Sequence, residues 1–235
     1  MSERVAVLLY ARMPEHRYKV AQAERIVREM LARVQAPYAA YSTGKDSQVV
    51  LDLVRHAAPD VPAIYGDDEW KLPETDAMLD STLNLVRIPM RVRHAEWFTA
   101  HEDSDLPDPT PTWAANMGYD GCFLGLRMDE NAKRRLLVRA RGATFYNERR
   151  RIWTCCPIAA WSVRDVWAYL LSRRLPYNAA YDVLERLGIP LAQQRIGPFA
   201  VERVLGCGQL AILKRGWPDL FNRFAAAHPE ARAYV

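Results

Sequence analysis

Apolar and polar positions alternate along this chain in a pattern that predicts short buried strands separated by helices. In residues 15–35, apolar side chains recur at three- and four-residue spacing opposite a charged face, which is typical of an amphipathic helix. The small and aromatic stretch 38–41 is expected to be a buried strand, and the apolar positions of 48–57 have helical spacing. A polar loop joins these last two segments, so the pattern indicates the start of a strand–loop–helix–strand unit.

The same alternation continues as far as residue 175. Further strands are expected at 63–65, 85–88 and 121–126, and further helices at 73–83 and 161–175, the last one capped by Ser162. The segment 94–117 is rich in proline, aspartate, tryptophan and threonine, and it is expected to be an insertion or a lid loop. The remainder is expected to be mostly helical. Strands separated by helices predict a parallel α/β sheet, whose ligands bind beyond the carboxyl ends of the strands.

Composition excludes several classes of protein. The 235 residues are 50% hydrophobic, and 32 basic residues against 28 acidic ones leave a net charge of only +4. This balance argues against disorder and against a wholly basic nucleic-acid binder. No apolar run approaches the roughly 18 residues of a membrane span, and charges on both sides of the apolar N-terminal run argue against a signal peptide. We therefore expect a cytoplasmic protein that does not bind a membrane.

Cysteine and histidine are too scattered to predict a metal site. The four cysteines, Cys122, Cys155, Cys156 and Cys207, form no CxxC pair, and the five histidines form neither HxH nor HxxxH. We therefore expect no zinc and no iron–sulfur cluster. The vicinal pair Cys155-Cys156 is interpreted as buried packing in an apolar stretch.

The loop at residues 42–47, Ser-Thr-Gly-Lys-Asp-Ser, has the chemistry of an anion-binding turn. Its three hydroxyls are hydrogen-bond partners for a phosphate, and Gly44 permits close approach of the backbone. Lys45 adds a point charge, and the helix after the loop presents N–H groups to an anion. The loop lacks the longer GxxxxGK[ST] spacing of a Walker A motif, and an ordinary polar turn between strand and helix stays open as the alternative.

In its context this loop resembles the pyrophosphate-binding loop of the ATP pyrophosphatase (PP-loop) superfamily, the adenine nucleotide alpha hydrolases. Within that superfamily, the chain is similar to the phosphoadenosine phosphosulfate (PAPS) reductase family, which includes ATP sulfurylase small subunits and DNA phosphorothioation proteins. The family's other motifs follow in the same order: Ile64–Asp67 and Leu72–Thr75; Gly125, Arg127, Glu130 and Arg134; Pro157–Trp161, Asp165–Trp167, Leu175–Asn178 and Tyr181-Asp182. Together they cover about residues 38–185.

The resemblance implies a fold, its ligands and a set of site residues. The fold would be a Rossmann-like core with a parallel sheet at 37–185, preceded by a helical segment at 1–36 and followed by a helical extension at 186–235. The ligands would be ATP, or a related adenine nucleotide, and Mg²⁺. The residues expected to bind the nucleotide are Ser42, Thr43, Gly44, Lys45, Asp46, Ser47, Asp67, Gly125 and Arg127. Lys45, Asp46 and Arg127 are expected to be catalytic. Asp46 and Asp67 are expected to hold the magnesium.

Asp67 and Arg127 also have an interpretation that depends on the residues alone. Each follows an expected strand, so a parallel sheet would bring both toward its ligand-binding edge. A carboxylate there suits a ribose hydroxyl or a phosphate-bound magnesium, and a planar guanidinium suits a phosphate or a sulfate. The alternatives stay open: a solvated acidic turn at 67–69, and a surface ion pair of Arg127 with Asp129 or Glu130.

Departures from the family pattern favour its ATP-using members over its reductases. The reductases lack the loop lysine and carry a catalytic cysteine in a terminal ECGxH context, whereas this chain has Lys45-Asp46 and no such tail. Cys207, which a glycine follows, is the cysteine to test as a nucleophile. Asn131 stands where the family often has serine, and Glu69 where it often has glycine.

These observations lead to three hypotheses. The first is an ATP-dependent transferase in sulfur metabolism or nucleic-acid modification, which cleaves ATP between its α and β phosphates, transfers AMP to an acceptor and releases pyrophosphate. Lys45 would stabilise the charge on the pyrophosphate, and the acceptor stays open among sulfate, a nucleic-acid base and a flavin precursor. The second is a thiol-dependent PAPS reductase with Cys207 as the nucleophile. The third is a nucleotide-binding regulator or nucleic-acid accessory protein without turnover.

Positive charge is concentrated in residues 127–151. Nine basic residues against three acidic ones give this segment a net charge of +6, which leaves −2 for the rest of the chain. Interleaved with Phe145 and Tyr146, such a cluster suits a phosphate backbone. A solvated surface or a contact between subunits is the alternative. The partners left open, besides the adenine nucleotide, are therefore nucleic acid, a partner subunit and a second copy of the chain in a homodimer.

Overall fold

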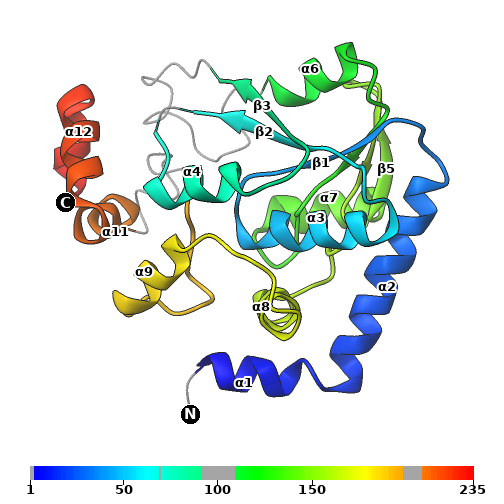
Figure 1. Cartoon of the computed structure of the whole chain (residues 1–235), viewed down its shortest axis with the longest axis horizontal. Helices are drawn as coiled ribbons and strands as arrows, with labels where there is room; N and C mark the ends of the chain where they lie inside the picture. Colours follow the sequence, from blue (N-terminus) through cyan, green and yellow to red (C-terminus); the bar gives the residue numbers. More distant parts are fainter. Residues whose placement is uncertain (1–2, 69, 91–108, 198–207) are drawn as a thin grey trace. The chain divides into compact units, whose positions relative to one another are not determined.

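Six strands form one sheet in the computed structural model, which describes residues 3–68, 70–90, 109–197 and 208–235 (Figure 1). The strands are β1 Pro37–Ala40, β2 Ala63–Asp67, β3 Leu85–Pro89, β4 Gly121–Phe123, β5 Thr144–Asn147 and β6 Ile152–Cys155. Their order across the sheet is β3-β2-β1-β4-β6-β5. β1 runs parallel to β2 and β4, and β4 runs parallel to β6, whereas β5 pairs antiparallel with β6. The α/β fold with a mostly parallel sheet is therefore confirmed.

Helices connect the strands, and two of them, α7 and α8, begin at residues with capping side chains. Their bounds are α1 Glu3–Tyr10, α2 Pro14–Leu31, α3 Lys45–Ala57, α4 Pro73–Asp80, α6 Thr110–Asn116, α7 Ala132–Arg141, α8 Val163–Ser172, α9 Ala180–Arg186, α11 Gln209–Gly216, α12 Pro218–Ala227 and the 3₁₀ helix η2 Pro229–Tyr234. Ser162 caps α8 as expected, in a capping box with Asp165. The Asn131 side chain caps α7 by accepting the N–H of Arg134, and Gly142 ends that helix with a φ of 78°.

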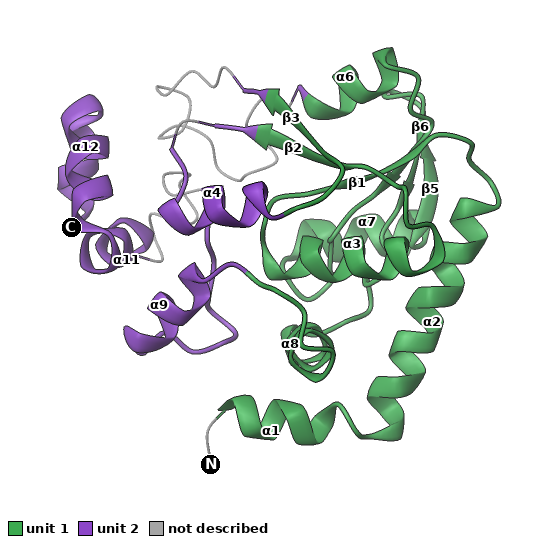
Figure 2. Ribbon diagram, viewed as in Figure 1, with its two compact units in different colours: residues 1–66, 82–88, 110–177 green, residues 67–81, 89–109, 178–235 purple. Residues whose placement is uncertain are grey.

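The chain divides into two compact units (Figure 2). The first contains residues 1–66, 82–88 and 110–177, and with them most of the sheet and helices α1 to α3 and α6 to α8. The second contains residues 67–81, 89–109 and 178–235, and with them helices α4, α9, α11 and α12. The domain boundaries expected from the sequence, after residues 36 and 185, stay a prediction.

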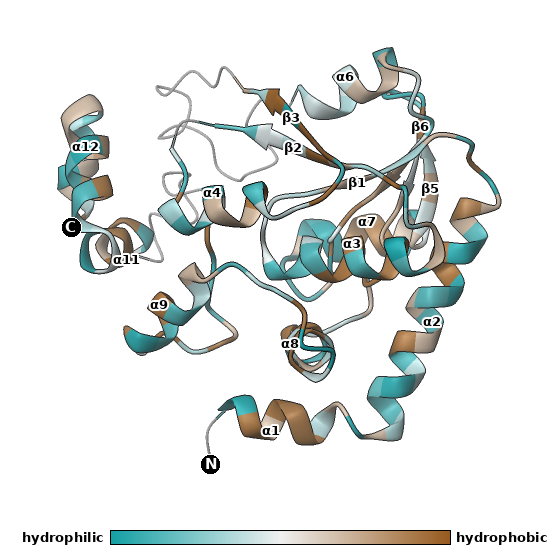
Figure 3. Cartoon of the chain, viewed as in Figure 1, coloured by the Kyte–Doolittle hydropathy of each residue, from teal (hydrophilic) through white to brown (hydrophobic). Residues whose placement is uncertain are grey.

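The first unit has its core against the sheet. One cluster joins Tyr38, Ile64, Cys122 and Ile152, from four different strands, with Ala114 of α6. Parts of β1, β2 and β3 are hydrophobic, whereas hydrophobic and hydrophilic residues alternate along α2 (Figure 3). α3 packs against β1, β4, α2 and α8, and it buries most of its apolar positions. Burial on both faces is the reason that these strands appear in the sequence as short continuous apolar runs.

The second unit has an aromatic core of its own. The ring of Trp70 contacts the ring of Phe224 edge to face, with centroids 5.2 Å apart, and lies 5.8 Å from that of His228. The indole Nε1 of Trp217 donates to both carboxylate oxygens of Glu74, each at 3.0 Å. The unit thus joins residues next to α4 with α12, although about 140 residues of sequence separate them.

Several expected elements differ from those observed. The helix expected at 15–35 ends at Leu31, and the strand expected at 121–126 ends at Phe123. The prediction of a loop at 94–117 is wrong for its last part, because Thr110–Asn116 is helical and Ala114 is fully buried in the core. Residues 91–108 lie outside the described part of the chain. The sequence pattern predicts none of α7, β5 and β6, whereas α1 lies within the helical segment expected at 1–36. Among the described residues, no helix has the length and apolar character needed to cross a membrane.

Candidate functional site

The loop 42–47 connects the carboxyl end of β1 to the first turn of α3. Thr43 has a φ of 58°, in the left-handed region that a β-branched residue rarely adopts, and its side chain is buried. Gly44, in contrast, has an extended backbone with a φ of −70° and forms the N-cap of α3. The sharp turn of the loop therefore occurs at Thr43, whereas Gly44 supplies the transition into the helix.

Two serine hydroxyls hold this loop closed. Ser47 Oγ accepts the backbone N–H of Ser42 at 3.1 Å and donates to the carbonyl of Gly44 at 2.9 Å. The Oγ atoms of Ser42 and Ser47 are 3.1 Å apart. Beyond the loop, the Tyr41 hydroxyl donates to Gln48 Oε1 at 2.7 Å. These bonds fix the first turn of α3, whose N-terminal dipole favours an anion.

Asp46 lies between two cations. Its Oδ1 accepts from Arg127 Nε at 2.5 Å, and its Oδ2 is 3.1 Å from Lys45 Nζ. Lys45 and Arg127 are both buried, with exposed fractions of 6% and 5%. Arg127 also contacts Asp129 at 3.3 Å, but its burial rules out the alternative that it forms only a surface ion pair. The structure therefore brings Lys45, Asp46 and Arg127 together as one charged group.

The charge of Asp46 is stabilised within this group. Burial by itself would raise the pKa of the carboxyl, but the charges of Lys45 and Arg127 and the hydrogen bonds from them outweigh burial, so the pKa is lowered. The carboxylate is consequently ionised at neutral pH. Because each of its oxygens faces a cation, Asp46 in this arrangement positions Lys45 and Arg127.

Gly125 is required where the segment before Arg127 passes the loop. A Cβ atom at this position would lie 2.8 Å from the carbonyl carbon of Asp46 and 2.8 Å from the backbone nitrogen of Ser47. Both are backbone atoms that cannot move aside without shifting the loop. The glycine of the motif is therefore explained by close packing of two backbones, not by an unusual φ.

The remaining residues of the same motif hold this segment in place. Glu130 accepts the backbone N–H of Arg127 at 2.9 Å, and its carboxylate forms an ion pair with Arg134 in the first turn of α7. Asn131, which replaces the usual serine, serves as the N-cap of that helix. The turn from Gly125 to Arg134 is thus closed by its own polar side chains.

Asp67 belongs to the second unit, at the carboxyl end of β2. Its Oδ1 accepts from Lys71 Nζ at 2.7 Å, so the carboxylate has a local partner. No group of three or more His, Cys, Asp and Glu side chains suited to a metal occurs among the described residues. The assignment of magnesium to Asp46 and Asp67 stays a prediction. Glu69 and Cys207 lie outside the described part of the chain.

Other motif residues have structural partners in the second unit. Asn178 Nδ2 donates to Thr75 Oγ1 at 3.1 Å, and Asn178 Oδ1 accepts the backbone N–H of Ala180 at the start of α9. Both side chains are buried. The hydrogen bond between these two residues therefore links the Leu72–Thr75 motif to the Leu175–Asn178 motif, and their role here is structural.

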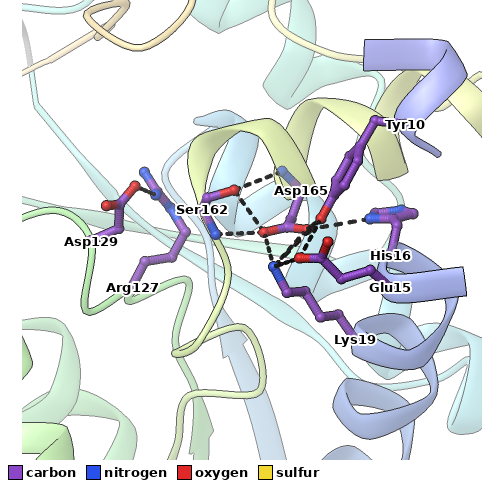
Figure 4. Close-up of polar contacts among 8 residues, drawn as sticks. All are labelled: Tyr10, Glu15, His16, Lys19, Arg127, Asp129, Ser162 and Asp165. Carbon is purple, nitrogen blue, oxygen red and sulfur yellow. Dashed lines mark hydrogen bonds and ion pairs between the residues drawn. The ribbon is translucent and has the colours of Figure 1, made fainter. Parts of the chain in front are cut away.

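A second polar cluster, which the sequence does not reveal, surrounds the fully buried Asp165 (Figure 4). Its carboxylate accepts from Lys19 Nζ at 2.9 Å and from the Tyr10 hydroxyl at 2.8 Å, and His16 Nδ1 lies 3.5 Å away. The backbone N–H and hydroxyl of Ser162 also donate to it, each at 2.7 Å. Because no local spacing relates α1 and α2 to α8, no sequence signal predicts these contacts.

The contacts of this second cluster stabilise the charge of Asp165 and link helices α1 and α2 to α8. Burial by itself would raise the pKa of Asp165, but hydrogen bonds from His16, Ser162 and Lys19 lower it. Burial, together with Asp165, raises the pKa of the Tyr10 hydroxyl to about 12, so it remains protonated at neutral pH. Both carboxylate oxygens of Asp165 accept hydrogen bonds from side chains or backbone of the protein.

The described cysteines are buried. Cys122, Cys155 and Cys156 lie in the core and form no disulfide. Burial raises the pKa of Cys155 to about 12, and it also raises the pKa of Cys156. The interpretation of Cys155-Cys156 as buried packing is confirmed.

Solved structures share the fold of this chain. PAPS reductase from Candida auris, in a phosphate complex, aligns with a TM-score of 0.55 and 19% identity over 76% of this chain and 88% of that one. FMN adenylyltransferase from Candida glabrata, in complex with ATP, aligns with a TM-score of 0.54 and 14% identity over 76% and 65%. At such identities, the similarity supports the fold alone.

Curated relatives are more similar in sequence. Sulfate adenylyltransferase subunit 2 of Rhodopseudomonas palustris is 27% identical over 201 residues, which cover 71% of this chain and 61% of the relative. The proteins of the same name from Burkholderia lata and Myxococcus xanthus are 28% and 29% identical, with 71% of this chain and 67% and 66% of the relative covered. The chain thus spans between three fifths and two thirds of the length of these relatives.

The family comparison covers the candidate site. The model of the phosphoadenosine phosphosulfate reductase domain matches residues 36–188, which is more than half of the chain. The matched range contains the loop 42–47, the turn from Gly125 to Arg134, and Asp165. From the motifs, the fold and this match, the chain belongs to the phosphoadenosine phosphosulfate reductase domain family.

Proposed function

We propose that the chain binds ATP at the loop 42–47 and transfers the adenylyl group to an acceptor with release of pyrophosphate. The observation that carries the proposal is the buried charged group of Lys45, Asp46 and Arg127 at the start of α3. It offers two cations and a helix N-terminus to phosphates. The names of the relatives, sulfate adenylyltransferase subunit 2, support ATP as the nucleotide and sulfur metabolism as the setting.

The proposed reaction breaks the bond between the α-phosphorus and the oxygen that bridges it to the β-phosphate. The acceptor oxygen attacks the α-phosphorus, and the electron pair of the broken bond leaves with pyrophosphate. Lys45 would stabilise the charge that develops on this leaving group, together with the first N–H groups of α3. Arg127, held by Asp46 on the same side, would bind the α-phosphate or the acceptor.

The two carboxylates expected to hold magnesium are both paired with cations of the protein in this structure. Both oxygens of Asp46 face cations, and Asp67 is paired with Lys71. Mg²⁺ with ATP is commonly held by phosphate oxygens and water with few protein ligands. Asp46 would therefore act as a positioning residue that holds Lys45 and Arg127.

The decisive experiment is turnover of α-labelled ATP with sulfate, a flavin precursor or a nucleic-acid base as acceptor. We expect an adenylylated product and stoichiometric pyrophosphate, both lost in Lys45→Ala. The matched control is Lys214→Ala, since Lys214 is an exposed lysine on α11. Unchanged turnover in Lys45→Ala would contradict the proposed role of the loop.

The name of the relatives also supports a partner subunit. Each is a "subunit 2", and by analogy the chain would turn over ATP fully only with a second protein that contributes groups to the acceptor side. In that case, the chain alone would bind ATP without rapid turnover. Binding without turnover, even with a candidate partner present, would instead favour the non-catalytic regulator.

Sulfonucleotide reduction is the second candidate, because the matching family is named for a reductase domain. Such a reaction needs a nucleophilic thiol. The described cysteines are buried, and burial raises the pKa of Cys155 to about 12. Cys207 is therefore the residue to test. Sulfite release from PAPS with a thiol donor, lost in Cys207→Ser, would favour reduction over adenylyl transfer.

A further inference from the structure

Arginines gather on two neighbouring elements of the first unit, α7 and the hairpin formed by β5 and β6. Residues 132–151 carry eight basic side chains and one acidic side chain, a net charge of +7, which leaves −3 for the rest of the chain. Seven of these eight basic residues are arginines. We call the six exposed arginines of this segment the arginine surface: Arg135, Arg139, Arg141, Arg149, Arg150 and Arg151.

The α7 part of this surface lies next to the candidate site. α7 has no acidic residue, and its buried Val138 packs against Cys156 and Ala159. The same cluster includes Leu124 and Leu126, which flank Gly125. The arginines on the outer side of α7 are therefore carried by the segment that also carries Arg127.

The hairpin part of the surface combines arginine with aromatic rings. β5 is an edge strand, and the turn that joins it to β6 exposes three consecutive arginines at 149–151. The ring of Tyr146, 41% exposed, lies 5.5 Å from that of Trp153. On the Trp153 ring, the guanidinium of Arg33 stacks at 4.6 Å.

The described residues place no counter-charge at ion-pair distance from the arginine surface. Within the described part of the chain, none of its six arginines has a carboxylate at ion-pair distance. Arg134, by contrast, pairs with Glu130, and Arg25 pairs with Glu29 at 3.0 Å. Like charges placed close together without counter-charges disfavour the folded state, so this arrangement is explained best by a partner that supplies negative charge.

We propose that the arginine surface binds the phosphodiester backbone of a nucleic acid. Arginine's planar fork forms two parallel hydrogen bonds with a phosphate, and arginine predominates here over lysine. Exposed tyrosine beside stacked arginine and tryptophan suits an unpaired base. A surface that binds an acidic protein is expected to have an apolar centre surrounded by charged residues. On α7, Leu136 alone is a large, exposed apolar side chain, so this helix offers no such apolar centre.

Binding to this surface does not depend on the proposed ATP chemistry. No residue of the arginine surface belongs to the loop 42–47 or to the pair formed by Asp46 and Arg127. A variant that loses nucleic-acid binding but keeps ATP turnover would therefore test the arginine surface alone. A variant that loses ATP turnover but keeps nucleic-acid binding would test the proposed ATP site alone. The shared ligand chemistry is the phosphodiester backbone, and the probes below separate duplex from single strands.

The test is fluorescence anisotropy of the whole chain with labelled single-stranded DNA, single-stranded RNA and duplex DNA of about 20 nucleotides, between about 50 and 200 mM salt. We expect binding that weakens steeply with salt. The triple variant Arg149→Ser, Arg150→Ser and Arg151→Ser should weaken it at least tenfold at low salt. If all three contact a duplex, the slope of log K against log salt should decrease by about 2.7.

The control removes the same charge elsewhere, by Arg186→Ser, Arg223→Ser and Arg232→Ser, which are exposed arginines of the second unit. It should change the affinity less than twofold to threefold, or about 0.4–0.65 kcal/mol. No binding of any probe at low salt would overturn the proposal, as would equal effects of the two triple variants. Circular dichroism would verify that each variant is folded, which is expected because the altered side chains are exposed.

Discussion

At the scale of single residues, the carboxylate of Asp46 holds the two cations of the candidate site in position. Asp46→Asn keeps the size of the side chain but removes the charge that attracts Lys45 and Arg127. It also removes a negative charge close to the proposed phosphates. We therefore expect kcat to fall at least tenfold, while KM for ATP changes less than about threefold.

Asp129→Asn is the matched control for Asp46→Asn. Asp129 contacts the same arginine at 3.3 Å, but its side chain is 55% exposed, so water screens the interaction. A threefold or smaller effect on kcat is expected. Equal losses in the two variants would contradict a positioning role for Asp46. Because the pKa of Asp46 is lowered, its protonation should not limit the wild-type activity above about pH 4.

Gly125→Ala tests the close packing of the two backbones. The added Cβ would lie 2.8 Å from backbone atoms of Asp46 and Ser47, so the loop must shift. We expect ATP binding to weaken more than tenfold and the protein to lose about 1–3 kcal/mol of stability. Isothermal titration calorimetry and urea unfolding would measure the two effects.

Gly216→Ala is the control for that substitution. Its Cβ would approach Leu187 Cδ1 at 3.2 Å, the end of a flexible side chain that can move. ATP binding should remain that of the wild type. If Gly125→Ala also bound ATP like the wild type, the contact between Gly125 and the loop would not matter for the nucleotide.

The residues of this site could be predicted from sequence as members of motifs, but their contacts could not. Lys45, Asp46 and Arg127 follow expected strands, and a parallel sheet gathers such positions at one edge. The ion pair between Asp46 and Arg127 depends on the neighbouring order of β1 and β4, which local periodicity does not encode. The left-handed turn at Thr43 is also not apparent, since the sequence places a glycine next to it.

At the scale of elements, Asp165 attaches α1 and α2 to α8. Asp165→Asn should destabilise the protein by about 1–3 kcal/mol at pH 7, because Lys19, Tyr10 and Ser162 lose their charged acceptor. Its pKa is lowered in the folded state, so the stabilisation is present above about pH 4 and declines as the pH falls below that value. Urea unfolding should therefore show a difference between wild type and variant that shrinks on acidification.

Glu29→Gln serves as the control within the same helical region. Glu29 pairs with Arg25 on α2, but both side chains are 58% exposed, so the pair contributes only about 0.3–0.5 kcal/mol. Equal stability losses in Asp165→Asn and Glu29→Gln, or a difference that grows below pH 4, would contradict the proposed attachment.

Two of the elements that the sequence pattern failed to predict, α7 and β5, share a physical reason, although β6 was also missed and is largely buried. Val138 is the one buried residue of α7, so the apolar periodicity of this helix is weak among the arginines. β5 is a short edge strand whose residues are only partly buried. β1 and α3, in contrast, are covered by the core and show clear patterns. In α7 and β5, the apolar periodicity is weak because few of their side chains are buried.

At the scale of the whole molecule, the range matched by the family domain is shorter than the two compact units of the chain. The match covers residues 36–188, yet the first unit includes α1 and α2, and the second unit continues to residue 235. α2 packs against α3, α8 and β6. Its Val27 and Met30 are fully buried. The apolar positions of 15–35 predicted a helix, but not that it completes the core of the domain that follows.

We therefore expect that a chain trimmed to residues 36–235 does not fold stably. Removal of α1 and α2 exposes the apolar surfaces that Val27 and Met30 cover, and it leaves Asp165 buried without Lys19 or Tyr10. Losing several large core side chains costs about 2–5 kcal/mol each, which is comparable to the total stability of a domain. Circular dichroism and urea unfolding should show loss of a cooperative transition.

The control is a chain of residues 1–233, which lacks only Tyr234 and Val235, both largely exposed. It should unfold with nearly the same midpoint as the full chain, because the two side chains are exposed at the surface. If the chain of residues 36–235 also unfolded cooperatively at that midpoint, α1 and α2 would not contribute to the stability of the domain, and the prediction would be contradicted. A midpoint that is lowered but still cooperative would place their contribution below the total stability. Since the two helices supply core side chains and the partners of Asp165, we expect the transition itself to disappear.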